Sequence, residues 1–448
     1  ISETFSHMRV GFVVDWNTDI SSLMVLARNM FRELAKLMNE KKSFTITAIS
    51  KNFLGIGDIN QHFDLIHFPN LGGYTFPNDN ILNAKNLILS PSGIDEVIYR
   101  DQVFPDKKRW PIIERVINKE VPRWKQNIDK IKAVHVVTKS ELNEMNEYLG
   151  VPLEKMTIIP HGVNHDVFVP TKNKDELKNK ICKNFQLEEQ DYFIHISERN
   201  WARKNIPRIL EAFSEAKKCG LTQNLILVGK VHPFVIKKVK NISGVKIMGW
   251  VSEEHLIELI QGSHGIILPS IHEGFGLPLV ECMACGIPSI TSNKHGPPEV
   301  VGNSGILVDP YNIMEIKDAI LELGKNKELH SKLSKNALIR SKDFSWKNTA
   351  SSLLQLYEKI VTPQNSWNFE NSFEVSARRT LTTVCQLFTQ KDDENPYAPT
   401  IPLIEALLSF NYKKMIDWAL QYGLTEPKTR DFLLPLETWL RNKSEIKY

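Results

Sequence analysis

Several features that would assign a common class of protein are missing from this sequence. No apolar run reaches the eighteen or so residues that a membrane-spanning helix needs, and no secretory signal pattern opens the chain. The five cysteines favour a reducing, cytoplasmic setting over a disulfide framework. The 56 basic and 52 acidic side chains leave a formal charge of only +4, so the sequence does not predict nucleic-acid binding.

Signatures of bound cofactors and metals are also missing. No G-x-G-x-x-G follows the first predicted strand, where residues 14–19 stand, which argues against a nicotinamide or flavin site. No Asp-x-Asp occurs, so a carboxylate-bound metal has no obvious ligand pair and no metal is expected. Cys282 and Cys285 have the spacing of a redox or metal pair, but no second cysteine pair accompanies them. We interpret both as packing residues of a helix.

The chain alternates short apolar runs with longer helical patterns, which indicates an α/β fold. Its 448 residues exceed what one hydrophobic core usually organises, so two or three domains are expected. The first half predicts strands near residues 8–14, 43–50, 63–68, 85–90, 133–138 and 156–159. After a lysine-rich stretch, the second half predicts strands near 191–197, 224–229, 244–248, 264–269, 286–291 and 305–308. The pattern predicts two doubly wound parallel sheets.

Two glutamates, Glu273 and Glu281, lie eight positions apart around a glycine-rich turn. Residues 265–269 are expected to form a buried strand and residues 278–285 the first turns of a helix, which places Glu273 in a strand-to-helix loop. Such a loop presents backbone N–H groups and a positive helix terminus to a phosphate, while a carboxylate in the helix can accept hydrogen bonds from sugar hydroxyls. The segment therefore predicts a sugar-nucleotide pocket.

The paired glutamates resemble the E-x7-E signature of retaining glycosyltransferase family 4, also called glycosyltransferase group 1. The resemblance runs from about residue 8 to about residue 360, with the opening strand and residues 157–164 as further anchors. It implies the GT-B fold, in which two Rossmann-like domains face a cleft. The implied parts are an N-terminal acceptor domain (8–168), a C-terminal donor domain (169–345), a helix crossing back (346–362) and a helical extension (363–448).

The resemblance also implies roles for residues of the donor domain. Glu273, Arg199 and Lys204 would be catalytic: Glu273 would orient the sugar, and the two cations would neutralise the departing diphosphate, with Arg203 as a positional rival of Arg199. A covalent role for Glu273 is a weaker alternative to front-face attack. The other donor-binding candidates are Gly274, Phe275, Gly276, Leu277, Glu281, Gly229 and Trp250.

The N-terminal half departs from the family pattern. Residues 19–22, ending in Ser22, stand where many relatives carry paired glycines beside the donor phosphate, and Ser22 is the donor-binding candidate there. Ser92 occupies the place of a histidine that many relatives carry beside the sugar. Ser92, Asp95 and His161 are the candidates on the acceptor or sugar side.

The implied reaction moves a sugar, with mannose or another hexose favoured, from a GDP-, UDP- or ADP-sugar to a hydroxyl of a glycan or lipid-linked acceptor, with retention. The nucleotide sugar is a co-substrate, and no cofactor is expected. Two alternatives stay open. One is a catalytically weak nucleotide-sugar-binding subunit of a glycan assembly complex, and the other is a phosphorylase or epimerase on the same fold.

Two further segments have more than one interpretation. Residues 106–132 are basic and carry Trp110 and Trp124, so the segment is either a peripheral membrane contact or a solvated helix face with tryptophans packed inward. Pro111 and Pro122 are expected to interrupt any long helix there. The extension at 363–448 is either a packing or homo-oligomerisation module or a selector of the acceptor or of a partner enzyme.

Overall fold

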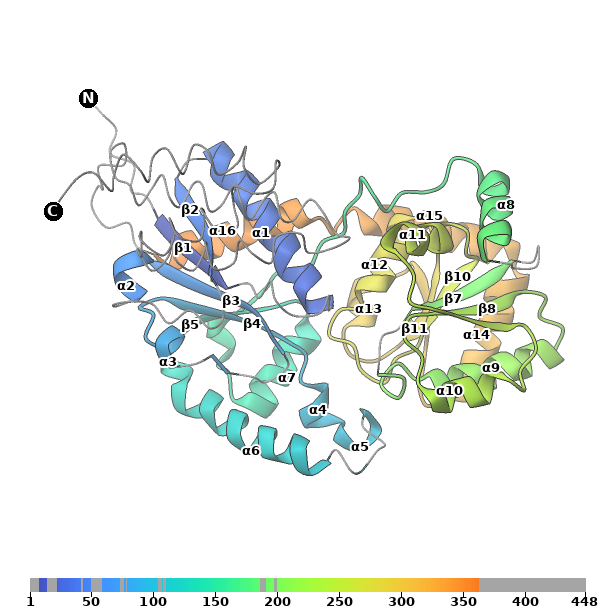
Figure 1. Cartoon of the computed structure of the whole chain (residues 1–448), viewed down its shortest axis with the longest axis horizontal. Helices are drawn as coiled ribbons and strands as arrows, with labels where there is room; N and C mark the ends of the chain where they lie inside the picture. Colours follow the sequence, from blue (N-terminus) through green and yellow to red (C-terminus); the bar gives the residue numbers. More distant parts are fainter. Residues whose placement is uncertain are drawn as a thin grey trace, which may run out of the picture.

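The computed structural model describes residues 8–13, 22–41, 43–49, 59–72, 76–77, 79–103, 107, 110–185, 191–196 and 200–361. In this part of the chain two six-stranded sheets form two domains that lie side by side (Figure 1). Every strand pairing within both sheets is parallel. The predicted fold class, two doubly wound parallel sheets, is confirmed. The predicted extension at 363–448 lies outside the described residues.

The first sheet has the strand order β2-β1-β3-β4-β5-β6. Its strands are β1 (Met8–Val13), β2 (Phe44–Ile49), β3 (Leu65–Gly72), β4 (Leu87–Ser92), β5 (Ile131–Val136) and β6 (Met156–Ile158). The helices between them are α1 (Ser22–Lys41), α2 (Ile59–His62), α3 (Asp79–Leu82), α4 (Asp95–Ile98), α5 (Arg100–Val103), α6 (Trp110–Asn127) and α7 (Lys139–Leu149). Two 3-10 turns, Ile128–Lys130 and Leu153–Lys155, precede β5 and β6.

The second sheet has the order β12-β11-β10-β7-β8-β9. Its strands are β7 (Tyr192–Ile196), β8 (Asn224–Val228), β9 (Val245–Gly249), β10 (Gly265–Leu268), β11 (Ser289–Ser292) and β12 (Gly305–Val308). The helices are α8 (Lys174–Phe185), α9 (Ile206–Lys218), α10 (Pro233–Val239), α11 (Glu253–Gln261), α12 (Leu277–Ala284), α13 (Pro297–Val301), α14 (Ile313–Lys325), α15 (Lys327–Ser341) and α16 (Trp346–Ile360). The strands predicted from the sequence all occur, with ends shifted by up to four residues.

Helices cover both faces of each sheet, as expected for parallel strands that are rich in apolar residues. In the first domain, α1 and α16 pack on one face, and α6 and α7 pack on the other. In the second domain, α9 and α14 cover one face, and α11, α12 and α15 cover the other. Cys282 on α12 and Cys285 at the C-cap of this helix are both buried, which agrees with their interpretation as packing residues.

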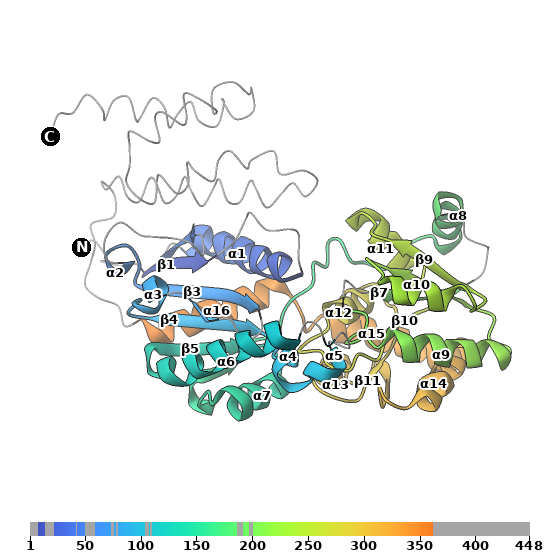
Figure 2. The ribbon, with the colours of Figure 1, turned by 60° about the horizontal axis from the view of Figure 1, so that its bottom comes forward.

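Helix α16 follows the second domain in sequence but packs with the first (Figures 1 and 2). Its apolar side, including Leu353, Leu354 and Tyr357, lies in the same core cluster as α1 and the first sheet. Ser345 begins the helix as an N-cap whose side chain accepts a hydrogen bond from the Asn348 amide. The first domain therefore depends on residues that the chain supplies more than 300 positions after β1.

A buried chain of hydrogen bonds fixes α16 to the first sheet. The Tyr357 hydroxyl lies 2.5 Å from His67 Nδ1, His67 Nε2 lies 2.7 Å from Ser90 Oγ, and Ser90 Oγ lies 2.8 Å from His135 Nδ1. His135 Nε2 lies 2.7 Å from the Ile159 carbonyl, so it must carry a proton. Nδ1 of the neutral His135 must then accept from Ser90, and Ser90 must accept from His67 Nε2. His67 Nδ1 is therefore an acceptor, and Tyr357 donates to it. Burial lowers the pKa of His135 to about 4, so the chain is neutral.

Helix α6 corrects one expectation. It runs without interruption from Trp110 to Asn127 through Pro122, so the prediction that Pro111 and Pro122 break it is wrong. Pro111 is the second residue of the helix, where its missing N–H has no intrahelical acceptor, and one interior proline did not outweigh the packing of Trp124. Trp124 is fully buried and meets Phe76 edge-on, whereas Trp110 is partly exposed beneath Arg100. Among the described helices, none is long and apolar enough to cross a membrane.

We expect Tyr357→Phe to lower the free energy of unfolding by about 1–3 kcal/mol, because His67 Nδ1 would keep its lone pair but lose its only donor in a dry core. Urea denaturation followed by circular dichroism measures the change. Tyr148→Phe, which alters a partly exposed ring on α7, is the matched control. Equal effects from the two variants would contradict the assigned direction of the hydrogen-bond chain.

Candidate active site

Two candidate catalytic residues, Lys204 and Glu273, lie in loops at the carboxyl ends of the parallel strands, where open α/β sheets bind ligands. Lys204 lies in the loop between β7 and α9, and Glu273 lies in the loop between β10 and α12. Asn205 joins these loops: its amide donates to the carbonyls of Pro269, at 2.9 Å, and of Pro310, at 2.6 Å. The residue adopts a left-handed backbone with φ of 61°, a conformation that asparagine tolerates. Lys204 is thereby held beside the β10 loop.

A buried ion pair joins two of the three predicted catalytic residues, Lys204 and Glu273. Lys204 Nζ lies 2.6 Å from Glu273 Oε1, and both residues are 7% exposed. Arg203 Nη1 lies 3.0 Å from the same oxygen. Burial alone would raise the pKa of Glu273, but Arg203 and Lys204 outweigh it and hold the value at about 2. Glu273 is therefore a dehydrated, fully ionised carboxylate at neutral pH.

Arg203 connects this ion pair with the first domain. Its Nε lies 3.4 Å from Asp95, the first residue of α4, and its Nη1 donates to the His272 carbonyl at 2.9 Å. Asp95, a sequence-predicted residue of the sugar side, thus lies in the same charged group as Glu273. Sequence reasoning treated Arg203 only as a rival of Arg199, and Arg199 lies outside the described residues.

The glycine-rich turn has the close backbone contacts that only glycine permits. Gly276 is the N-cap of α12 and has a φ of 89°, and no side chain caps the helix. A Cβ on Gly296 would lie 2.0 Å from the Gly274 carbonyl oxygen, so these two loops touch only because residue 296 is glycine. The Gly274 carbonyl also accepts from Thr138 of the first domain at 3.0 Å. The positive end of α12 therefore lies at the domain boundary, with Gly274 and Leu277 partly exposed.

Glu281 lies within α12, as the sequence predicted, and its pKa is opposite in direction to that of Glu273. Burial, with a smaller contribution from Glu253, raises the pKa of Glu281 to about 7. Near neutral pH this carboxyl can accept hydrogen bonds from hydroxyls as a carboxylate or donate one as an acid.

Two of the donor-binding candidates, Gly229 and Trp250, lie at the ends of β8 and β9. Gly229 follows β8 with a φ of 111° and donates its N–H to the Gly249 carbonyl at 2.7 Å. Trp250 follows β9 and is 74% exposed. The indole is thus available for stacking and is not a core residue.

The remaining candidates, Ser22, Ser92 and His161, belong to the first domain. Ser22 is the first residue of α1 and Ser92 the last of β4, but their side chains lie outside the described part of the structure. His161 is buried in an aromatic cluster with Phe275, at 5.3 Å between ring centroids, and Trp346, at 5.7 Å. Burial lowers the pKa of His161 to about 3, so its imidazole is neutral.

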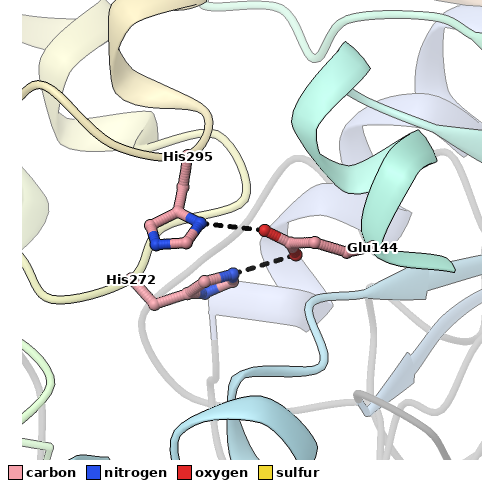
Figure 3. Close-up of side chains that lie close together, drawn as sticks. All are labelled: Glu144, His272 and His295. Carbon is pink, nitrogen blue, oxygen red and sulfur yellow. Dashed lines mark hydrogen bonds and ion pairs between the residues drawn. The ribbon is translucent and has the colours of Figure 1, made fainter. Parts of the chain in front are cut away.

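Sequence reasoning missed a cluster of one carboxylate and two imidazoles at the domain boundary (Figure 3). Glu144 on α7 accepts from His272 Nε2 at 3.0 Å and from His295 Nδ1 at 2.9 Å. Burial alone would raise the pKa of Glu144, but the two histidines lower it to about 2, and Glu144 in turn raises the pKa of His272. His272 directly precedes Glu273, and this adjacency was the only signal in the sequence.

Further polar contacts across the boundary involve the first turn of α7. The amides of Lys139 and Ser140 each donate to the Glu299 carboxylate at 2.8 Å. The Glu299 carboxylate of the second domain therefore lies at the positive N-terminal end of α7 in the first domain, an arrangement that the helix dipole favours.

Part of the chain is similar to a known family of proteins. Residues 178–340 match the glycosyl transferases group 1. The O-antigen chain mannosyltransferase B of Escherichia coli is 26% identical over 242 residues, 52% of this chain and 62% of that protein. The chain covers smaller shares of several other curated relatives.

Two solved structures share the fold. The sucrose-phosphate synthase of Thermosynechococcus elongatus superimposes with a TM-score of 0.60 at 16% identity, over 79% of this chain and 98% of that chain. Anabaena Alr3699/HepE, solved in complex with UDP and glucose, superimposes with a TM-score of 0.57 at 15% identity, over 78% of this chain and 99% of that chain.

We expect Lys204→Met and Glu273→Gln to be strongly coupled in stability. Lys204→Met alone should lower the free energy of unfolding by about 3 kcal/mol, because it removes one of the two cations beside a buried carboxylate. The double variant should lose at least about 1 kcal/mol less than the sum of the single variants. Guanidinium denaturation of all four proteins completes the cycle.

The surface pair Glu215 and Lys218 is the control for this cycle, because it has the same kind of contact, 2.7 Å, without burial. The corresponding variants Glu215→Gln and Lys218→Met should show no measurable coupling. Additive effects at residues 204 and 273 would show that the ion pair does not stabilise the site.

Proposed function

We propose that this chain, which has the GT-B fold and matches the glycosyl transferases group 1 over residues 178–340, transfers a hexose from a nucleoside-diphosphate sugar to an acceptor hydroxyl with retention. The observation that carries the proposal is the Glu273 carboxylate, buried and ionised beside Lys204 at the positive end of α12. This arrangement combines a carboxylate for the sugar with a cation and a helix terminus for the phosphates.

The leaving nucleoside diphosphate gathers negative charge as the bond to the sugar breaks. Lys204 would stabilise that charge together with Arg199, and the N–H groups of the turn at 274–277 would bind phosphate or sugar oxygens. These positive groups would take the part that a divalent ion takes in other transferases, so the proposed reaction needs no metal on the diphosphate. Arg203 is already paired with Glu273 and Asp95, which favours a positioning role for it.

Glu273 would face the sugar as an acceptor of hydrogen bonds from its hydroxyls. Because the neighbouring cations keep it ionised, the same carboxylate can stabilise the positive charge of an oxocarbenium-like transition state. Front-face attack by the acceptor hydroxyl then gives retention without a covalent glycosyl-enzyme. Glu281 would bind the ribose hydroxyls, and the exposed indole of Trp250 would stack on the base.

The first domain offers a place for the acceptor next to this site. A pocket of about 590 Å³ opens around α4, α5 and α6, with polar groups from Asp101, Gln102, Glu114 and Asn118. Carboxylates and amides bind sugar hydroxyls, and one wall is Tyr99, whose ring centroid lies 5.7 Å from that of His272. These features favour a glycan acceptor over the acyl chains of a lipid. The mannosyltransferase relative supports a hexose donor, and the UDP complex of the HepE structure makes UDP one of the bases to test.

The proposal predicts selective binding and slow hydrolysis of one nucleotide sugar. Among GDP-, UDP- and ADP-sugars with EDTA present, one should raise the melting temperature. At a hundredfold excess over its Kd, this nucleotide sugar should add about 2.7 kcal/mol to the free energy of unfolding. Lys204→Ala should weaken that binding, and Glu273→Gln should abolish hydrolysis while keeping most of the binding. Nucleotide release and thermal shift are the two measurements.

Lys332→Ala, which removes an exposed lysine of α15, is the matched control and should behave as the wild type. If the wild type binds a nucleotide sugar but does not turn it over, the result would favour a donor-binding subunit of a glycan assembly complex over a transferase. Turnover that requires inorganic phosphate would favour a phosphorylase. Absence of binding to every nucleotide sugar would contradict the proposal.

Donor affinity should also depend on pH through Glu281. With a pKa of about 7, this carboxyl is mostly protonated at pH 6 and mostly ionised at pH 8, and only the ionised form accepts hydrogen bonds from two ribose hydroxyls through both oxygens. The Kd for the donor should therefore fall about tenfold between pH 6 and pH 8. Calorimetric titration measures it, and Glu281→Gln should have a flat profile. If the Kd of Glu281→Gln depends on pH in the same way as that of the wild type, Glu281 is not the titrating group.

A further inference from the structure

We propose that Glu144, His272 and His295 form a site for one Zn²⁺ or a similar late first-row divalent ion, which links the two domains beside the catalytic loop. Glu144 comes from α7 of the first domain, His272 from the loop after β10 and His295 from the loop after β11 (Figure 3). One potential ligand atom from each residue lies within 4.8 Å of the other two. The proposal goes beyond sugar transfer and does not depend on it.

The donor set and its spacing suit such an ion. Two imidazole nitrogens and one carboxylate are ligands that zinc commonly has in sites with three protein ligands and one open position. Zinc bonds of about 2.0–2.1 Å place neighbouring ligands of a tetrahedron about 3.3 Å apart. The carboxylate oxygens of Glu144 lie 3.0 Å from His272 Nε2 and 2.9 Å from His295 Nδ1. Because one ligand atom from each residue lies within 4.8 Å of the other two, side-chain rotations that bring these atoms to about 3.3 Å would admit the ion.

Outer contacts already hold two of the three ligands in position. The hydroxyl of Tyr99 lies 3.1 Å from His295 Nε2, the ring nitrogen that faces away from Glu144. With the ion on Nδ1, that nitrogen would donate its proton to Tyr99. Ser140 Oγ donates to Glu144 Oε1 at 3.2 Å. Contacts of this kind fix the tautomer of a ligating histidine and the orientation of a ligating carboxylate.

Charge gives an independent argument. Glu144 is buried, and no lysine or arginine of the described residues forms a salt bridge with it; its salt-bridge partners are the two histidines. A buried carboxylate needs a compensating positive charge, which at this cluster only the two imidazoles or a bound cation can supply. Asp95 adds a further negative charge near His272. A divalent cation would supply this charge at the point where the three ligand atoms converge.

The ion would have a structural consequence for the catalytic loop. His272 precedes Glu273, and its carbonyl accepts from Arg203, which also pairs with Glu273. Binding would therefore fasten this loop to α7 without contact to the donor diphosphate. A protein that uses no metal for chemistry could in this way still be stabilised by one.

The test uses the full chain stripped of metal with a chelator and titrated with Co²⁺, whose visible absorption reports tetrahedral nitrogen and oxygen ligands. We expect one equivalent per chain, displacement of Co²⁺ by Zn²⁺, and a rise in melting temperature with Zn²⁺. Glu144→Gln should weaken binding by more than about 100-fold, because it removes a ligand directly. The readout is independent of nucleotide-sugar binding, so failure of one proposal leaves the other standing.

His330→Asn is the matched control. His330 stacks on His264 with ring centroids 4.1 Å apart, but Nε2 of each ring faces a backbone carbonyl, and the pair lies at the opposite end of β10. This variant should bind Co²⁺ as the wild type does. His295→Asn, on the more exposed edge of the cluster, provides a second ligand variant if Glu144→Gln does not fold. Absence of a cobalt spectrum in the wild type, or equal binding in a folded ligand variant, would overturn the proposal and leave a hydrogen-bonded contact between domains.

Discussion

The site depends on keeping one carboxylate ionised where water is excluded. Glu273 is buried at the end of a central strand, and a bare carboxylate there would take up a proton. Lys204 and Arg203 prevent this, and each is held by the loop that follows β7. Asn205 fastens that loop to the loops after β10 and β12. The position of the charge is therefore set by contacts among three strand ends.

The same constraint explains how the two domains are coupled. Arg203 contacts Asp95, Thr138 donates to the Gly274 carbonyl, and the Glu299 carboxylate accepts hydrogen bonds from the first amides of α7. Loops of both sheets therefore meet around the glycine-rich turn. Helix α16 adds a second connection, because it follows the second domain in sequence and completes the core of the first. A sugar bound beside Glu273 would thus contact groups positioned by both domains, which is the arrangement that transfer between two substrates requires.

Much of the fold could be predicted from the sequence because parallel strands buried on both faces appear as apolar runs, and glycines at a strand-to-helix turn appear as a local motif. The contacts of Glu144 with His272 and His295 could not be predicted, since they join residues more than a hundred positions apart and no local pattern encodes them. The continuity of α6 was missed for a different reason: proline propensity is local, whereas the burial of Trp124 that stabilises the helix is tertiary. The adjacency of Arg203 to Lys204 likewise gave no indication of which partner each would contact.

A crystal structure of the protein with a bound nucleoside diphosphate tests the central claim most directly. The account predicts diphosphate oxygens within hydrogen-bond distance of Lys204 Nζ and of the backbone amides at 274–277, with the ribose on Glu281 and the Glu273 carboxylate facing the vacant sugar position. A diphosphate bound away from Lys204 and the end of α12, or a nucleotide held by the first domain alone, would contradict it.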